Sequence, residues 1–273
     1  MGGNAGEAAL HHADLPGGRV EYRWAGPRLR DAALPVIVLL HEGLGSVALW
    51  KDFPDRLAEA TGLPVLVYSR VGYGGSAPCA LPRPLTYMHE EGERALPALI
   101  AALGIGRHIL VGHSDGASIA LIYAGAAREA VPERDGLLGV AALAPHVFCE
   151  EVSVASIRAA GRAYAEGDLR SRLEKYHGSN IDCAFRGWCD SWLNPDFMKW
   201  NIEGYVDRID VPVLVIQGEG DEYGTAAQVE SIARRVPAGA GVLMLPDCGH
   251  SPHRDQPGAT LDALAGFASK LYR

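Results

Sequence analysis

The sequence has few cysteines, no cluster of basic residues and no apolar run long enough to cross a bilayer. Its five cysteines include no C-x-x-C pair and do not form an even set, so we expect reduced, mostly buried thiols rather than a disulfide framework. The 25 basic residues are outnumbered by 33 acidic ones, giving a net charge of −8, which argues against nucleic acid as a partner. The first residues also lack the basic start and apolar core of a signal peptide. The sequence therefore predicts a cytoplasmic protein with no membrane partner.

What the sequence contains is an alternation of apolar runs with amphipathic segments, and 48% of its residues are hydrophobic. Apolar runs typical of buried strands lie at residues 35–40, 63–68, 107–111, 137–143, 211–217 and 241–245. Segments with helical spacing lie at residues 47–61, 85–103, 117–127, 225–236 and 257–272. This order predicts an α/β fold, with a mostly parallel sheet, helices on both faces and an antiparallel hairpin at residues 11–24 on its edge.

The stretch around Ser114 has the pattern of a strand, a tight turn and a helix. An apolar run ends in Gly112-His113-Ser114-Asp115-Gly116, and apolar residues at helical spacing follow. Such a bend exposes its central hydroxyl, and glycines are needed on both sides because a Cβ there would clash. Amides at the start of the next helix can stabilise negative charge. Ser114 is therefore the candidate nucleophile; the alternative is an ordinary turn with a serine as helix cap.

A glycine-rich loop with the sequence HEGLG, at residues 41–45, follows the third predicted strand. Loops at the carboxyl ends of central strands supply ligand-binding backbone in α/β sheets, and free amides here can point toward the serine. We assign the first oxyanion donor to Gly43, with Leu44 as the alternative, and the second to Asp115. The competing interpretation is an ordinary connection between a strand and a helix.

An acid and a histidine follow the serine at the ends of later predicted strands. Asp221 comes after the strand at residues 211–217, and His250 comes after the last strand. Because parallel strands bring their carboxyl ends to one edge, both residues can meet Ser114 there. His250 would take the serine proton and return it to the leaving group, while Asp221 fixes the imidazole tautomer. This chemistry calls for no metal ion and no cofactor.

Other residues compete for these two roles. We favour Asp221 as the acid because it stands fourth in the Gly-Glu-Gly-Asp segment at a strand end. The competing acids are Glu222, Glu150 and Glu151. The competing bases are His113, beside the nucleophile and expected to point away, and His146, at a strand end and expected to line the pocket.

Residues 147–210 contain no convincing buried strand and hold three of the five tryptophans. A segment this long needs helices of its own, so we expect a helical lid over the strand ends. Trp188 and Trp192 would line an apolar acyl pocket together with His146. The alternative is that these rings only attach the lid to the core. The chain then divides into two core parts, residues 1–146 and 211–273, and the lid between them.

Together these motifs resemble the α/β-hydrolase family over nearly the whole chain. The resemblance rests on HEGLG at residues 41–45, GYGGS at 72–76, GHSDG at 112–116, GEGD at 218–221 and GHSP at 249–252. It implies an eight-stranded sheet and a catalytic triad of Ser114, Asp221 and His250. Serine rather than aspartate at the nucleophile position argues against the dehalogenases and epoxide hydrolases of the family. The family usually has His-Gly where this chain has His41-Glu42-Gly43, so the oxyanion donor is fixed only to within one residue.

The resemblance defines the substrate poorly, because the same site chemistry serves several bond types. We expect a serine hydrolase that cleaves a small to medium carboxylic ester, lactone or thioester through an acyl-enzyme, with a small-molecule acyl substrate as its partner. One alternative is a C–C bond hydrolase of the meta-cleavage (vinylogous diketone) type. Another is a non-catalytic binding protein that keeps the fold, which an intact triad argues against. A homodimer is left open.

Overall fold

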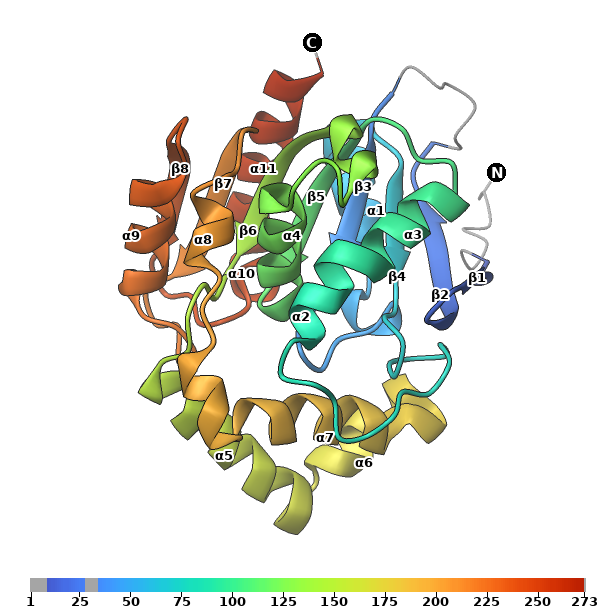
Figure 1. The fold of residues 1–273 in the computed structure, drawn as a ribbon, viewed down its shortest axis with the longest axis vertical. Helices are drawn as coiled ribbons and strands as arrows, with labels where there is room; N and C mark the ends of the chain where they lie inside the picture. Colours follow the sequence, from blue (N-terminus) through green and yellow to red (C-terminus); the bar gives the residue numbers. More distant parts are fainter. Residues whose placement is uncertain (1–8, 28–33, 273) are drawn as a thin grey trace, which may run out of the picture.

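The computed structural model describes residues 9–27 and 34–272, which form one eight-stranded sheet (Figure 1). The strand order is β1-β2-β4-β3-β5-β6-β7-β8, and all pairs from β4 to β8 are parallel. β1 and β2 pair antiparallel at one edge. The strands are β1 (His11–Leu15), β2 (Gly18–Ala25), β3 (Val36–Leu40), β4 (Val65–Tyr68), β5 (His108–His113), β6 (Leu137–Leu143), β7 (Val213–Gly218) and β8 (Ala240–Leu245). The predicted α/β sheet with its edge hairpin is confirmed.

The central strands are apolar throughout because helices cover both faces of the sheet. In β3, Val36 and Val38 belong to one core layer, whereas Ile37 and Leu39 belong to the other. The first layer packs under α3 (Leu96–Ala102), α4 (Asp115–Gly125) and α9 (Ala226–Arg235), and the second under α1 (Phe53–Thr61) and α11 (Pro257–Leu271).

Two predicted helices are interrupted in the structure. The segment at residues 47–61 begins as a 3-10 turn, η1 (Ala48–Trp50), and α1 starts only at Phe53, with Pro54 in its first turn. Proline is favoured at the start of a helix because backbone N–H groups of the first turn have no partner within the helix, so the absence of one there breaks no hydrogen bond. The segment at residues 85–103 is α2 (Tyr87–Glu90), a π-helical turn, η2 (Glu91–Ala95), and α3.

Between β6 and β7 the chain forms a helical insertion, residues 147–210. It contains α5 (Glu151–Glu166), α6 (Leu169–His177), η4 (Gly178–Asn180), α7 (Ile181–Trp192), η5 (Pro195–Lys199) and α8 (Glu203–Val206). Helices α5, α6 and α7 lie below the sheet in Figure 1, whereas α8 packs against α4. The isolated bridge between Phe148 and Asn201 is the one strand-like pairing recorded in this insertion, all of whose residues are described. Sequence reasoning left α7 without a secondary structure.

The five cysteines are free, but only Cys189 and Cys248 are buried. The expectation of mostly buried thiols is wrong for Cys79, Cys149 and Cys183, because these three lie at the boundary between core and insertion rather than inside a core layer. No helix within residues 9–27 and 34–272 is long and apolar enough to cross a membrane.

Candidate active site

Ser114 sits in a strained turn between β5 and α4. Its φ of 53° and ψ of −120° are a conformation that non-glycine residues rarely adopt. The turn needs small neighbours: a Cβ on Gly116 would lie 2.2 Å from the carbonyl oxygen of Leu40, and one on Gly112 would lie 2.3 Å from that of Gly116. The two glycines thus allow strand and helix to approach closely enough to present the hydroxyl.

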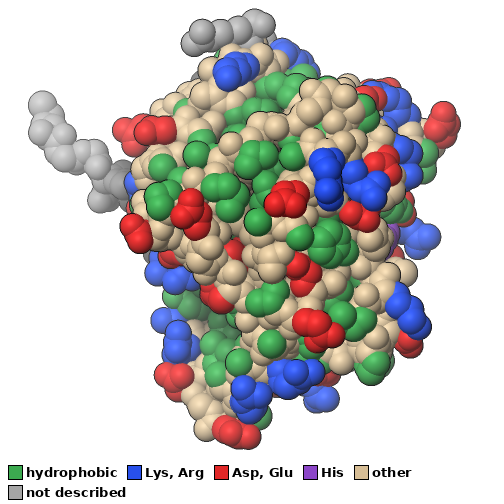
Figure 2. All heavy atoms as spheres, turned by 90° about the vertical axis from the view of Figure 1, so that its left-hand side faces the viewer, with side chains coloured by type: hydrophobic (Ala, Val, Ile, Leu, Met, Phe, Trp, Pro, Cys, Tyr) green, Lys and Arg blue, Asp and Glu red, His purple; other side chains and the backbone are tan. Residues whose placement is uncertain are grey.

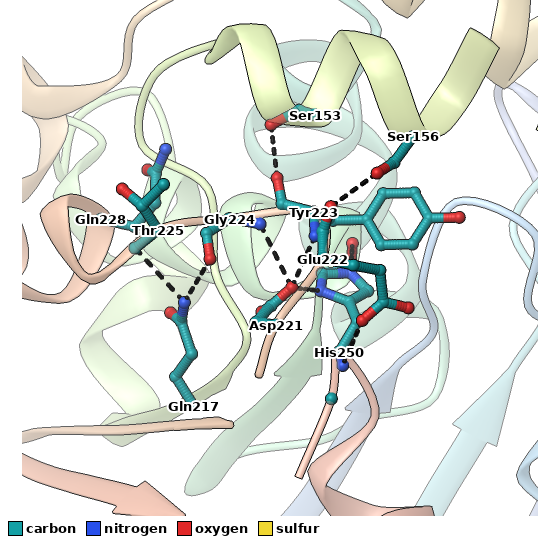
Figure 3. A network of polar contacts seen from close by, with 12 residues as sticks. Ser153, Ser156, Gln217, Asp221, Glu222, Tyr223, Gly224, Thr225, Gln228 and His250 are labelled. Atoms are coloured by element: carbon teal, nitrogen blue, oxygen red, sulfur yellow. Dashed lines mark hydrogen bonds and ion pairs between the residues drawn. The ribbon is translucent and has the colours of Figure 1, made fainter. Parts of the chain in front are cut away.

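The structure brings Ser114, His250 and Asp221 into one chain of hydrogen bonds. His250 Nε2 lies 2.9 Å from Ser114 Oγ, and His250 Nδ1 lies 2.8 Å from Asp221 Oδ1. Asp221 follows the end of β7 and His250 follows the end of β8, so both side chains reach the carboxyl edge of the sheet. Figure 3 shows Asp221 directed at the imidazole of His250.

Asp221 determines which nitrogen of His250 carries the proton. An ionised carboxylate can only accept hydrogen bonds, so Nδ1 donates and Nε2 is left to accept from the hydroxyl of Ser114. Oδ1 also accepts from the backbone N–H groups of Tyr223, at 2.8 Å, and Gly224, at 3.2 Å. Burial by itself raises the pKa of Asp221, but the hydrogen bond and charge of His250 and the Tyr223 N–H outweigh it, so the pKa lies below its ordinary value.

Helix α5 holds the loop that carries the acid, residues 218–224, which we call the acid loop. Ser153 Oγ donates to the carbonyl oxygen of Tyr223, at 2.5 Å, and Ser156 Oγ donates to that of Glu222, at 2.6 Å (Figure 3). Sequence reasoning missed both serines, because nothing in a polar helix face indicates which distant loop it contacts.

The competing acids do not reach Nδ1 of the histidine. Glu150 accepts hydrogen bonds from the hydroxyl and the N–H of Thr225, at the start of α9. Glu151 is exposed at the start of α5. Glu222 accepts from the backbone N–H of His250, at 3.2 Å, and so positions this residue without contacting its ring nitrogens.

The competing bases form no recorded hydrogen bond with Ser114 Oγ, which instead lies beside His250 Nε2. The Nε2–H of His113 donates to the carbonyl oxygen of His250, at 2.7 Å, and its Nδ1 lies 3.6 Å from Glu42. His146 is buried, and its ring centroid lies 5.6 Å from that of His250. Burial, and after it the charge of His250, lowers the pKa of His146 to about 3, which leaves it neutral.

Near Ser114, three backbone N–H groups have no hydrogen-bond partner among the described residues. In the part of the chain that the structure describes, no hydrogen bond uses the amides of Gly43, Leu44 or Asp115. Unpaired amides beside a nucleophile are available to an oxyanion.

Arg70, a buried residue after β4, fixes the loop at residues 41–45. Its guanidinium donates to the carbonyl oxygens of His41, at 2.5 Å, and Glu42, at 3.0 Å, and its backbone N–H donates to His41 Nε2, at 3.1 Å. Because Arg70 holds the carbonyl oxygens of His41 and Glu42, the peptide groups that contain them, and with them the N–H of Gly43, are fixed in orientation. An arginine beside a glycine-rich loop was the available sequence signal, but neither its burial nor its partners were apparent.

A histidine of the insertion joins the same loop to its neighbour. His177 Nδ1 accepts from the N–H of Gly74, at 3.1 Å, so its Nε2 carries the proton and donates to the carbonyl oxygen of Leu44, at 2.9 Å. Next to it, Asn180 Nδ2 donates to the carbonyl oxygens of Gly74 and Ser76, at 3.0 and 2.6 Å. The insertion is thereby tied to two of the loops at the carboxyl edge of the sheet.

The side chain of Asp115 faces away from the serine. It accepts a hydrogen bond from the hydroxyl of Tyr87, at 2.5 Å, and Trp192 Nε1 donates to the same hydroxyl, at 3.1 Å. Burial raises the pKa of Asp115, against the nearby charge of Arg70 and the hydrogen bond from Tyr87.

Comparison with known proteins identifies the family of the chain. The model of the family described as "Alpha/beta hydrolase family" matches residues 37–263. The chain belongs to the α/β hydrolase family. An sn-1-specific diacylglycerol lipase of Mus musculus is 26% identical over 261 residues, which are 87% of this chain and 82% of the lipase.

Solved structures of other hydrolases share the fold. A serine hydrolase involved in carbazole degradation superimposes with a TM-score of 0.74 at 17% identity, covering 97% of this chain and 100% of the other. The enol-lactonase from Burkholderia xenovorans gives a TM-score of 0.70 at 20% identity, covering 95% and 100%. At these identities the likeness concerns the fold alone.

The α/β hydrolase has a cavity of about 580 Å³ that opens onto Ser114 and His250. It lies between the sheet edge and α6 and α7 of the insertion. Its walls include the loop at residues 41–45, two helices of the insertion, the acid loop and the loop after β8. The lining residues besides Ser114 and His250 are Glu42, Gly43, Leu44, Leu49, Lys51, His113, Leu169, Arg172, Leu173, Lys175, Tyr176, Trp188, Glu222, Tyr223, Ser251 and Arg254. This volume is in the range that small-molecule sites usually have.

Of the three residues expected to line the substrate pocket, only Trp188 does so. Its indole lies directly over Gly43, where an added Cβ would be 2.3 Å from the ring. Trp192 and His146 are buried behind the cavity, and their ring centroids are 5.2 Å apart. The expectation fails for Trp192 because its ring packs against those of Phe197 and Trp200 in tilted contacts and belongs to the core layer, and His146 lies buried beside it.

Proposed function

We propose that this α/β hydrolase is a serine hydrolase of a small to medium carboxylic ester, lactone or thioester. The observation that carries the proposal is the hydrogen-bonded chain from Ser114 through His250 to Asp221, open to a cavity beside three unused amides. The name of the mouse diacylglycerol lipase, which denotes hydrolysis of a carboxylic ester, supports the same bond type.

The first half of the reaction would transfer the acyl group to the enzyme. Ser114 Oγ attacks the carbonyl carbon while His250 Nε2 takes the hydroxyl proton, and Asp221 stabilises the imidazolium that forms. The tetrahedral intermediate then collapses, its bond to the leaving group breaks, and Nε2 returns the proton to the departing alcohol or thiol. A water molecule repeats the sequence on the acyl-enzyme, so the acid leaves and Ser114 regains its proton.

The negative oxygen of the tetrahedral intermediate needs fixed donors. The amide of Asp115 and that of Gly43 or Leu44 are candidates, because they flank Ser114 and bind nothing else in the described part of the chain. Each such donor contributes about 3 to 4 kcal/mol to catalysis in related chemistry. The positive end of α4, which begins at Asp115, adds to the same field.

A panel of p-nitrophenyl esters of increasing acyl length tests the proposal. The wild type should hydrolyse at least one of them, a fluorophosphonate probe should label it, and Ser114→Ala should lose both properties. Hydrolysis only of a vinylogous diketone from ring cleavage would favour the C–C hydrolase alternative. Ligand binding without turnover or labelling would favour a binding protein that keeps the fold.

A further inference from the structure

The cavity above Ser114 carries an excess of positive charge at its walls. Four basic side chains line it, Lys51, Arg172, Lys175 and Arg254, and all four are exposed. The whole chain has a net charge of −8, so this excess is opposite in sign to the rest of the molecule. On the face in Figure 2, by contrast, acidic and basic side chains are interspersed.

The cavity also holds two carboxylates, Glu42 and Glu222, which offset only part of this positive charge. Neither forms an ion pair with one of the four cations in the described part of the chain: Glu42 lies 3.6 Å from Nδ1 of His113, and Glu222 accepts from the backbone N–H of His250. Burial by itself raises the pKa of Glu42, but the contact with His113 outweighs it and lowers the pKa, so four positive side chains face two negative ones.

Within the part of the chain that the structure describes, three of the four cations have no acidic partner. Among the described residues, Lys51 and Arg254 form no side-chain hydrogen bond or ion pair, and Lys175 only lies over the ring of Tyr176. Arg172 has a loose contact of 3.5 Å with Asp168, in which both side chains are mostly exposed. Such an exposed pair is worth little and is easily replaced by a ligand.

The cations come from three separate segments and converge on one opening. Arg172 and Lys175 are three residues apart on α6 and therefore share a face of that helix. Lys51 follows η1, and Arg254 belongs to α10 (Pro252–Asp255). In contrast, Arg170 of the same helix α6 contacts Glu174 and Asp182, away from the cavity.

We infer that the substrate carries an anionic group, a carboxylate or a phosphate, beyond its reactive carbonyl. This inference rests on the proposed ester hydrolysis and specifies its substrate class. Clustered cations in a cavity raise the local concentration of anions and accelerate their capture. Because the cations are exposed, the effect weakens with salt, over a screening length of about 10 Å at 0.1 M.

Two pairs of substrates that differ mainly in charge test the inference. The carboxylate pair is mono-4-nitrophenyl adipate and its neutral methyl ester. The phosphate pair is S-butyryl-4′-phosphopantetheine and neutral S-butyryl pantetheine. We expect kcat/KM to favour the anion at least tenfold in one pair at low salt, and this ratio to shrink in 0.5 M NaCl. The pair with the larger ratio identifies the anion.

Matched variants locate the effect. Arg172→Gln combined with Lys175→Gln should reduce the anion preference several-fold, mainly through KM. Arg158→Gln combined with Arg162→Gln removes the same charge from exposed positions of α5 outside the cavity and should leave the ratio unchanged. Equal kcat/KM within both pairs, or an unchanged ratio in the cavity variant, would overturn the inference. If neither the neutral nor the charged esters are cleaved, the proposed function itself fails.

Discussion

Asp221 acts through a single oxygen atom, which accepts from His250 and from two backbone N–H groups. Replacing it by asparagine keeps the shape but removes the charge that holds Nδ1 protonated. We expect Asp221→Asn to lower kcat by about 10³- to 10⁴-fold, with a melting temperature close to that of the wild type. Ester hydrolysis under saturating substrate and a thermal melt measure the two quantities.

The adjacent carboxylate provides the control. Among the described residues, the side chain of Glu222 accepts one hydrogen bond, from the backbone N–H of His250, so Glu222→Gln should keep kcat within about tenfold of the wild type. If Glu222→Gln were inactive while Asp221→Asn stayed active, the acid would be Glu222 and the assignment to Asp221 would be wrong.

At the residue scale, the sequence predicts the place of a residue when the segment next to it in the chain determines that place. Ser114, Asp221 and His250 each follow directly after a buried strand, and parallel strands end at one edge, so their approach could be expected. Arg70 and His177 could not be predicted in the same way. Their partners lie 28 or more residues away along the chain, and no local pattern indicates them.

Helix α7 shows how two similar residues on one element acquire different roles. Trp188 and Trp192 are four residues apart, yet one forms the cavity wall and the other packs in the aromatic cluster of the insertion. The sequence shows that tryptophans gather in this segment. The direction of each ring, however, depends on how α7 is rotated against the sheet edge.

Replacing each of these two tryptophans by alanine should therefore have different effects. Trp188→Ala enlarges the cavity over Gly43, so we expect kcat/KM to shift about tenfold in favour of longer p-nitrophenyl esters. Trp192→Ala removes a fully buried ring and the donor to Tyr87, and should lower the free energy of unfolding by about 3 to 5 kcal/mol. Urea unfolding and the ester panel measure these effects, and identical behaviour of the two variants would contradict the distinction.

For the molecule as a whole, buried histidines affect acid stability, and His146 and His253 are two of them. Burial, before the effect of neighbouring charges, lowers the pKa of both His146 and His253 to about 3. In the unfolded chain a histidine titrates near 6.5, so the unfolded state binds more protons between these values and stability falls as the pH decreases from about 6.5. Each histidine contributes on the order of 1 kcal/mol per pH unit in this window.

His253 lies among the rings of Trp50, Phe53 and His113, where phenylalanine can replace it. We expect His253→Phe to unfold less steeply with pH between 6.5 and 4, as measured by urea titrations at several pH values. Phe53→Leu should lower stability by a similar amount at every pH and leave the slope unchanged. An unaltered slope in His253→Phe would mean that acid sensitivity arises elsewhere.

Two sets of contacts that fasten the insertion to the core involve loops beside Ser114: Ser153 and Ser156 bind the acid loop, while His177 and Asn180 bind the loops after β3 and β4. Its anchors are the same loops that carry Asp221 and the amides of Gly43 and Leu44, so opening the insertion would break the hydrogen bonds that hold these loops. We therefore expect a dissolved substrate molecule to enter through the existing opening of the cavity. Rates measured across the critical micelle concentration of a long-chain ester should thus rise smoothly to saturation with monomeric substrate, with no jump when an interface forms.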